Sequence, residues 1–322
     1  MTTATRTVDL DGLLSRLEDR TAEKIGTEPR VVLKDIDSFR LDELQIGPTW
    51  HRLTDIVAVS FDLKSSTNLE KGRSPQGTAS IYDAGIGGVV RTLNDFGAEF
   101  VDIQGDGGFG LFWGRNAYTK AICAAVTIRS FSANFQQQIQ DKWENLPSTG
   151  FKVGISSGPV MVKLVGLERH LDMQEPVWVG RPVNYATKAA QQTAPDNIVI
   201  TGSVWDQIAD NDYLAFSCGC GGGAVKSAVP GLLWTGREID KIPDGQKYGL
   251  ELGSTWCAHH GEEFCNLILS GATDRYDIPS SARAAREALS HGTELQAAAE
   301  ERRSDRTRRF EELAEFRKAA AR

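Results

Sequence analysis

Apolar strands and amphipathic helices alternate regularly along the chain from Asp55 onward. Residues 56–63 form a mostly apolar run of strand length, and the spacing of Ile81, Ile86 and Leu93 predicts a helix over 79–96. The same patterns predict strands over 98–104, 108–113, 151–156, 159–165, 197–201 and 232–239, and helices over 116–139 and 180–192. The order strand, helix, two strands, helix, strand is that of the βαββαβ ferredoxin-like unit. We therefore predict an α+β fold with an antiparallel sheet and helices packed on it.

The residues outside this alternation divide the chain into further segments. An amphipathic helix is predicted over 9–25, and the texture changes again after residue 240. The predicted segments are a helical lead-in over 1–50, the α+β domain over 51–240, a Cys/His-rich module over 241–275 and a polar helical tail over 276–322. The module shares Cys218 and Cys220 with the domain before it. The tail is dominated by Ala, Arg and Glu, and suits either a solvated face or a partner helix.

Composition excludes several classes of protein. The length of 322 residues suggests about two domains, and the net charge of −7 argues against a surface that binds nucleic acid. No run approaches the roughly 18–20 apolar residues that a membrane span needs. The first residues lack the basic and apolar regions of a secretory signal. We therefore expect a cytoplasmic protein without a membrane partner, whose five cysteines are thiols or metal ligands rather than disulfides.

Two carboxylates stand where predicted strands give way to turns. Asp62 lies at the end of the strand in SFDLKSST, and Asp106 lies in the hairpin signal QGDG. If the strands are neighbours, two carboxylates about 4 Å apart repel by several kcal/mol, and Mg²⁺ or Mn²⁺ removes that repulsion while binding substrate phosphates. The pair therefore favours phosphoryl chemistry. Taken alone, Asp62 would fit a helix cap and Asp106 a turn residue before glycine.

The residues after Asp62 add a second phosphate signal. Ser65, Ser66 and Thr67 suit the cap of a helix, and the free N–H groups of a first helical turn bind phosphate. Thr67 is therefore a candidate substrate-binding residue.

In combination, these motifs resemble the class III nucleotidyl cyclases, the adenylate and guanylate cyclase type, over residues 55–240. The resemblance implies that Asp62, the backbone carbonyl of Leu63 and Asp106 bind two Mn²⁺ or Mg²⁺ ions in each active site. One metal would lower the pKa of the ribose 3′ hydroxyl that attacks the α-phosphate. The other would bind the β- and γ-phosphates of the leaving diphosphate.

Two further motifs carry the resemblance. The sequence VGRPVNYATKAA is similar to the family's helix with an Asn followed four residues later by an Arg, and Asn184 matches the Asn. The Arg position holds Lys188, which keeps the charge and loses the planar fork of donors. Lys226 stands where the family keeps a lysine that binds the triphosphate. In the family the Asn and Arg come from the other subunit, so the resemblance implies a head-to-tail homodimer with two interfacial sites.

The positions that select the base depart from the purine cyclases. Asp102 lies four residues before Asp106, where the family usually has Lys or Glu, and Val177 lies seven residues before Asn184, beside Trp178. This is neither the adenine nor the guanine pattern. Because a base is recognised by its hydrogen-bonding edge, the change implies a different and smaller base.

A second group of residues has metal-binding chemistry. Cys and His ligands in pairs two to five residues apart suit tetrahedral Zn²⁺, which takes four of them. Five candidates stand for the four places: Cys218, Cys220, Cys257, His260 and Cys265. Small buried thiols with a capping histidine are the alternative. Cys123 lies within a helical apolar pattern and is predicted to belong to the core.

A cyclase followed by such a Cys/His module resembles a narrower group, the bacterial pyrimidine cyclases of Pycsar antiphage defence, over roughly residues 50–270. That resemblance implies Mn²⁺-dependent conversion of UTP or CTP to cyclic UMP or CMP. The product would be a second messenger that activates a downstream effector in abortive infection. Two other hypotheses stay open: a purine cyclase with unusual selector residues, and a nucleotide-binding sensor without catalysis, which Lys188 keeps in play.

Overall fold

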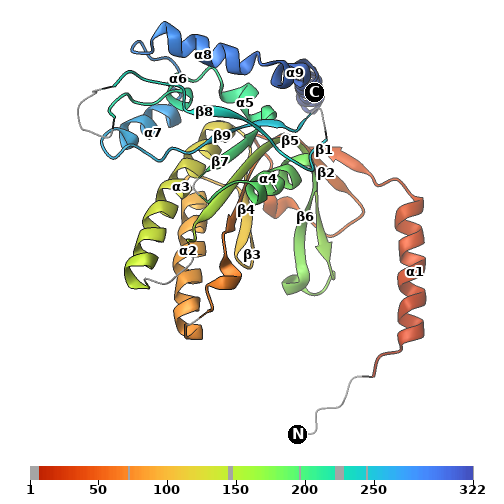
Figure 1. Cartoon of the computed structure of the whole chain (residues 1–322). Coiled ribbons are helices and arrows are strands. Elements are labelled where there is room, and N and C mark those ends of the chain that lie inside the picture. The colour runs from red at the N-terminus through yellow and green to blue at the C-terminus, as the bar shows by residue number, and fades with distance from the viewer. Residues whose placement is uncertain are drawn as a thin grey trace.

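The computed structural model describes residues 7–71, 73–143, 148–195, 197–221, 228–243 and 246–321 (Figure 1). A mixed sheet lies at its centre, with the strand order β3-β4-β2-β5-β7-β9-β8. Short strands extend it: β1 pairs with β2, and β6 pairs with β5. The strands are β1 (Val31–Leu33), β2 (Trp50–Leu63), β3 (Phe100–Gln104), β4 (Gly107–Phe112), β5 (Phe151–Gly166), β6 (Gln174–Gly180), β7 (Ile198–Thr201), β8 (Trp234–Glu238) and β9 (Tyr248–Leu252).

Most neighbouring strands run antiparallel, which confirms the predicted α+β class. The parallel pairs are β1 with β2 and β5 with β7. The helices are α1 (Leu10–Gly26), α2 (Pro75–Asp95), α3 (Ala117–Lys142), α4 (Arg181–Gln192), α5 (Gly202–Ile208), α6 (Asp212–Ala215), α7 (Gly261–Leu269), α8 (Ser280–Ser290) and α9 (Thr293–Ala320). Single 3-10 turns are η1 (Leu41–Glu43), η2 (Ser66–Asn68) and η3 (Leu171–Met173). Among the described residues, no helix combines the length and apolar character needed to cross a membrane.

The central strand β2 is buried on both faces because successive side chains alternate. Val57, Val59 and Phe61 pack in the core formed with α2 and α3, which lie side by side (Figure 1). Ile56 and Ala58 face the other way, into a second cluster that includes residues of α4 and α9. Asp62 follows Ile56 and Ala58 in the alternation and therefore lies on the same side of the sheet as they do.

The predicted strands 151–156 and 159–165 form one continuous strand, β5. Its pairing with β2 is irregular at one place, where Leu53 is opposite Val160 and Ile56 is opposite Gly158. Pro159 therefore lies opposite the irregularity, where its missing N–H costs no ladder hydrogen bond. Asp55 lies on β2 in this irregular stretch, away from the regular alternation.

Two other expectations change. The helix expected directly after Ser65–Thr67 is only the 3-10 turn η2, whose N-cap residue Ser65 is left-handed and makes no side-chain cap. The long helix α2 begins at Pro75, and its cap is Ser74, whose Oγ accepts from Gly77 N at 3.2 Å. The strand β9 was not predicted, and it lies within the sheet between β7 and β8.

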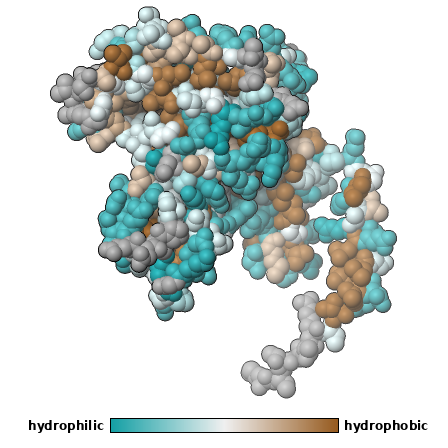
Figure 2. Space-filling view, viewed as in Figure 1, coloured by the Kyte–Doolittle hydropathy of each residue, from teal (hydrophilic) through white to brown (hydrophobic). Residues whose placement is uncertain are grey.

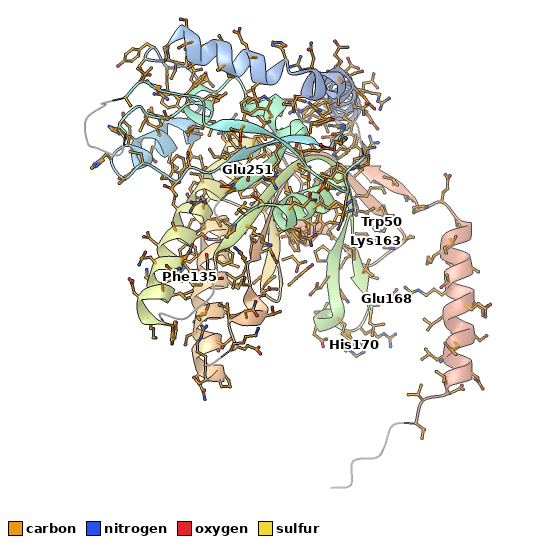
Figure 3. All side chains as sticks on the ribbon, in the orientation of Figure 1. Trp50, Phe135, Lys163, Glu168, His170 and Glu251 are labelled. Carbon is orange, nitrogen blue, oxygen red and sulfur yellow. The ribbon has the colours of Figure 1, made fainter. Side chains whose placement is uncertain are left out.

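Two apolar surfaces project from the body of the protein. The helix α1 stands apart and buries none of its residues, so Leu10, Leu14 and Leu17 are exposed (Figures 1 and 2). The β5–β6 hairpin also projects, and Figure 3 shows Glu168 and His170 at its tip. Exposed apolar side chains along the hairpin are Val165, Leu167, Leu171, Met173, Val177 and Val179.

The position of α4 depends on the absence of a side chain at Gly154 of β5. A Cβ at this residue would lie 2.1 Å from Ala186 O and 2.4 Å from Ala190 N, both in the backbone of α4. Ala186, Ala189 and Ala190 are fully buried where the helix crosses the sheet. Strand and helix backbones therefore pack in direct contact.

We expect Gly154→Ala to force α4 away from the sheet and to lower the free energy of unfolding by about 1–3 kcal/mol, as overpacking does. Urea unfolding of the full chain measures the change. Gly87→Ala is the matched control, because a Cβ there meets nothing within 4 Å in the exposed part of α2, and it should be neutral or stabilising by up to about 1 kcal/mol. Equal midpoints for Gly154→Ala and the unsubstituted protein would contradict this account of the contact.

Candidate active site

The strand pairing brings the two predicted metal-binding aspartates together. Asp62 is opposite Gly107 in the β2–β4 ladder, and Asp106 occupies the turn that joins β3 to β4. The N–H of Leu63 donates to the carbonyl of Asp106 at 3.0 Å, so the backbones of the two loops are in direct contact. Both side chains line one cavity of about 140 Å³.

Steric constraints explain why glycines surround Asp106. Gly105 has φ +66°, a left-handed conformation that suits the tight turn. A Cβ at Gly107 would lie 2.7 Å from Phe61 O, and one at Gly108 would lie 2.1 Å from Asp102 O. The motif therefore lets three backbone segments meet at the floor of the cavity.

Helix α4 and strand β5 complete the surroundings of the carboxylates. Thr187, Ala190 and Gln191 of α4 line the cavity opposite the sheet. Lys152 of β5 is paired with Asp62 in the β2–β5 ladder, and its Nζ lies 3.5 Å from Asp62 Oδ2. Asp106 has no ion pair among the described residues. One ammonium group therefore pairs with one of the two carboxylates, which leaves negative charge for a cation, and hard divalent metals prefer such oxygen ligands.

Two neighbours of Asp62 differ in exposure. The side chain of Leu63 is buried in the core at 1% exposure, so only its backbone is available near the cavity. Thr67 is exposed on η2 and does not line the cavity. The role of each residue toward substrate stays a prediction.

The predicted base-selecting residues lie outside this cavity. Asp102 on β3 accepts a hydrogen bond from Gln104 Nε2 at 2.8 Å. Val177 on β6 is 40% exposed, and alternation along the strand directs it away from the face of Trp178. Trp178 instead lies 5.4 Å from Phe100 of β3, ring centre to ring centre. The structure therefore places Trp178, rather than Val177, toward the strand that carries Asp102.

The predicted catalytic residues of α4 are also outside the cavity of their own chain. Asn184 is exposed two turns before Gln191, roughly 10 Å along the helix axis. Lys188 donates from Nζ to the carbonyl of Lys241 at 2.6 Å and lies 5.7 Å from the ring centre of Tyr185. Lys226 lies outside the described residues. Within one chain, Asn184 and Lys188 thus do not line the cavity of the carboxylates.

Four of the five predicted zinc ligands form one cluster. The ligand atoms of Cys218, Cys220, Cys257 and His260 all lie within 4.8 Å of one another. Cys220 Sγ lies 3.2 Å from the Sγ atoms of both Cys218 and Cys257, and Cys257 Sγ lies 3.6 Å from His260 Nδ1. Three thiols and one imidazole are a donor set that suits tetrahedral Zn²⁺.

Cys265 lies outside the cluster and interacts with Cys123, which is fully buried in α3 as predicted. The hydrogen bond with Cys265 and burial both raise the pKa of Cys123. Burial also raises the pKa of Cys257, but backbone N–H groups of His259 and His260 outweigh it and lower the value to about 6. A thiolate at Cys257 suits a metal ligand.

Hydrogen bonds attach the cluster to the rest of the protein. Trp256 donates from its backbone N to Ser130 Oγ at 2.9 Å and from Nε1 to Thr127 Oγ1 at 2.7 Å. Both acceptors lie on α3. The segment with Cys257 and His260 is therefore held against the helix that supports the central sheet.

Sequence reasoning missed Lys152 and Gln191. Neither belongs to a motif, and each reaches the carboxylates only through the β2–β5 register or the crossing of α4. Only the register between β2 and β5 places Lys152 opposite Asp62. The assembled group of two carboxylates, one lysine and polar side chains can bind a metal-chelated anion.

Comparison with known proteins gives the family. No protein-family model matches the chain. A uridylate cyclase of Propioniciclava tarda is 43% identical over 282 residues, 85% of this chain and 90% of that protein. A uridylate cyclase of Micromonospora echinofusca is 44% identical over 278 residues, 84% of this chain and 88% of that protein.

The solved structures agree on the fold. The adenylyl cyclase CyaB from P. aeruginosa superposes with a TM-score of 0.51 at 14% identity, over 64% of this chain and 96% of that one. At this identity the likeness concerns the fold alone. Together with the extensive identity to the two curated relatives, it shows that the chain belongs to the uridylate cyclases and has the fold of class III nucleotidyl cyclases.

Proposed function

We propose that the protein converts UTP to 3′,5′-cyclic UMP and diphosphate in a metal-dependent reaction. The observation that carries the proposal is that Asp62 and Asp106 line one cavity at the end of the central strands. The names of the two curated relatives support UTP as the substrate. CTP is the alternative pyrimidine substrate.

The reaction is an intramolecular displacement. The ribose 3′ oxygen forms a bond to the α-phosphorus, the bond from that phosphorus to the bridging oxygen of the β-phosphate breaks, and diphosphate leaves. The 3′ hydroxyl loses its proton. Asp62, Asp106 and the carbonyl of Leu63 would hold Mn²⁺ or Mg²⁺, which when bound lowers the pKa of the hydroxyl and stabilises charge on the phosphates. Lys152 would contribute a positive charge beside Asp62.

The active form is proposed to be a homodimer. Asn184 is exposed on α4 and lies outside the cavity of its own chain, so it is available to the site of a second copy. Lys188 would need to exchange its bond to the Lys241 carbonyl for a phosphate. The exposed apolar residues of the β5–β6 hairpin are a surface that a second copy would cover.

The remaining roles follow the family pattern. Asp102 and Val177, with Trp178 beside them, would select the pyrimidine, while Thr67 and Lys226 would contact the phosphates. The division into a helical lead-in over 1–50, a cyclase domain over 51–240, a Cys/His-rich module over 241–275 and a helical tail over 276–322 stays a proposal. The resemblance to Pycsar cyclases supports a cytoplasmic enzyme whose product activates an effector in antiphage defence.

We further propose that Cys218, Cys220, Cys257 and His260 bind one structural Zn²⁺. The short distances among four soft ligands support this site, and the same cluster would join the Cys218–Cys220 loop to the segment before α7. Cys265 is left out because it interacts with Cys123.

Replacing either aspartate should abolish cyclisation and leave the fold intact. Purified protein is incubated with Mn²⁺ and each of UTP, CTP, ATP and GTP separately, and products are identified by mass spectrometry. We expect cyclic UMP, and a decrease of at least about 100-fold in Asp62→Asn and Asp106→Asn, because a bound metal supplies several kcal/mol to the transition state. Asp83→Asn, an exposed position on α2, is the control. Cyclic AMP or GMP as the main product, or full activity in either aspartate variant, would refute the proposal.

Purified protein should contain about one zinc per chain. Cys257→Ser should lose the metal and lower the melting temperature, since binding to a structural site contributes folding energy. Cys265→Ser is the matched control and should retain zinc. Metal content is measured by mass spectrometry and stability by circular dichroism. Metal-free native protein, or equal zinc loss in both variants, would argue against this ligand set.

A further inference from the structure

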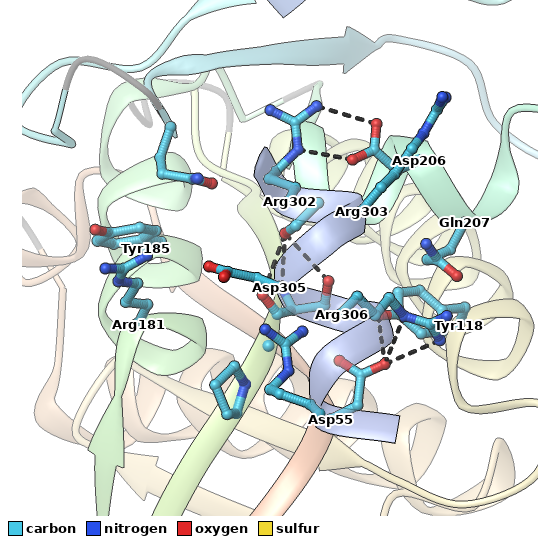
Figure 4. A pocket seen from close by; sticks show the side chains of 16 residues that line it. Asp55, Tyr118, Arg181, Tyr185, Asp206, Gln207, Arg302, Arg303, Asp305 and Arg306 are labelled. Atoms are coloured by element: carbon cyan, nitrogen blue, oxygen red, sulfur yellow. Dashed lines mark hydrogen bonds and ion pairs between the residues drawn. The ribbon is translucent and has the colours of Figure 1, made fainter. Parts of the chain in front are cut away.

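A second cavity lies between α4 and α9, away from the carboxylates (Figure 4). Its volume is about 60 Å³. Figure 4 shows α9 crossing it, with Arg181 and Tyr185 of α4 on the opposite side. Arginines line it in excess over acids: Arg181, Arg302, Arg303, Arg306 and Arg309 with Asp55, Asp206 and Asp305.

Each of the three acids already has an arginine partner. Burial leaves Asp55 and Asp206 dependent on such partners, because an unpaired buried charge is costly. The side chain of Asp305 is 40% exposed. Asp55, which is 5% exposed, also accepts a hydrogen bond from Tyr118 Oη at 2.9 Å. The pairs are Asp55 with Arg306 at 3.1 Å, Asp206 with Arg302 at 2.7 Å and Asp305 with Arg308 at 2.8 Å.

Three arginines at the cavity remain without an ion pair in the described part of the chain: Arg181, Arg303 and Arg309. Arg309 is the most informative, because its Nε is buried and has no hydrogen-bond partner. Asp55 attracts it electrostatically without accepting a hydrogen bond from it. Burial lowers the pKa of Arg309. The cavity thus holds a buried donor, Arg309 Nε, that has no hydrogen-bond partner among the described protein atoms, beside one buried acceptor, Asp55 Oδ1, that has none either.

We propose that this cavity binds a phosphate group, with Arg309, Arg181 and Arg303 as its donors. Guanidinium groups are planar donors that match phosphate oxygens in pairs. The cavity takes one phosphate group rather than a whole nucleotide, so the ligand is a phosphate anion or one end of diphosphate or of a longer phosphate chain. The pairing of Asp55, Asp206 and Asp305 with other arginines limits their repulsion of such an anion.

The place of the cavity connects it to the active site, and this step rests on the proposed function. Arg181 and Tyr185 line the cavity from α4, the helix that also carries Asn184 and Lys188. In a homodimer that helix approaches the nucleotide of the second copy. The phosphate therefore has two sources: a free anion that affects α4 through Arg181, or the triphosphate of a nucleotide held by the partner.

Binding is tested first with inorganic diphosphate alone, by titration calorimetry, without nucleotide, Mg²⁺ or Mn²⁺. We expect saturable binding that weakens at least about tenfold in Arg309→Gln, since the substitution removes the charge-assisted hydrogen bonds of the guanidinium group. Arg181→Gln, exposed on α4, is a second variant that does not disturb a buried group. Lys318→Gln removes one charge from an exposed site on α9, the helix of Arg309, and should bind as the original protein does.

No saturable binding, or equal binding in all three variants, would overturn the proposal. Diphosphate is also the leaving group of the proposed reaction and can bind the active site, so the difference between the arginine variants and Lys318→Gln, rather than binding alone, reports on this cavity. That difference is expected whether or not the protein is a cyclase. Melting curves without ligand confirm that each variant folds.

A mixing experiment distinguishes the two sources. Arg309→Gln is combined with Asp106→Asn, and cyclic UMP is measured. If the arginines act on the partner's nucleotide, each variant alone is impaired and the mixture recovers activity, because a mixed dimer contains one intact site. If Arg309→Gln loses diphosphate binding and keeps its activity with UTP, the ligand is a free anion.

Discussion

The register between β2 and β4 is the constraint on which the active site depends. Asp62 is opposite Gly107, and the Leu63 N–H to Asp106 carbonyl bond follows directly from that pairing. A slip of one residue would turn Asp62 toward α2 and α3 and expose Phe61 to the cavity. Such a slip is opposed by the burial of Val57, Val59 and Phe61, each at most 1% exposed. The hydrophobic core therefore determines where the carboxylates lie, and core residues such as Phe61 and Phe109 themselves line the cavity.

Helix α4 extends the same constraint to a second place. Its alanines pack on Gly154 with no side chain between the two backbones, so the helix has little freedom to shift on the sheet. Gln191 near its end faces the carboxylate cavity, while Arg181 at its start faces the arginine-lined cavity. A ligand that displaced one end of α4 would therefore also displace the residues at its other end, because close-packed elements transmit displacement.

The apolar pattern was enough to predict the main strands and helices, because long periodic segments are decided by burial. The paired aspartates could be identified for the same reason, since each ends such a segment. The helix predicted after Ser65 from local propensity was wrong. Ser65 has a left-handed backbone and makes no side-chain cap, and a single 3-10 turn follows it. Sequence spacing also could not separate Cys265 from the other thiols, because its partner Cys123 is far away in the chain. Lys152 required a strand register that no motif records.

The tail shows what the polar composition of residues 280–322 concealed. Arg302, Arg306 and Arg309 are spaced by four and three residues, so they share one face of α9. Arg302 is 9% exposed, and a charge this buried needs the carboxylate that Asp206 provides. Ion pairs thus orient the helix on the domain, with Leu313 buried beyond them. Two of the three arginines form ion pairs with acids of the protein, and Arg309 forms none among the described residues. In a chain with a net charge of −7, that arginine beside a cavity is the observation on which the proposed phosphate site rests.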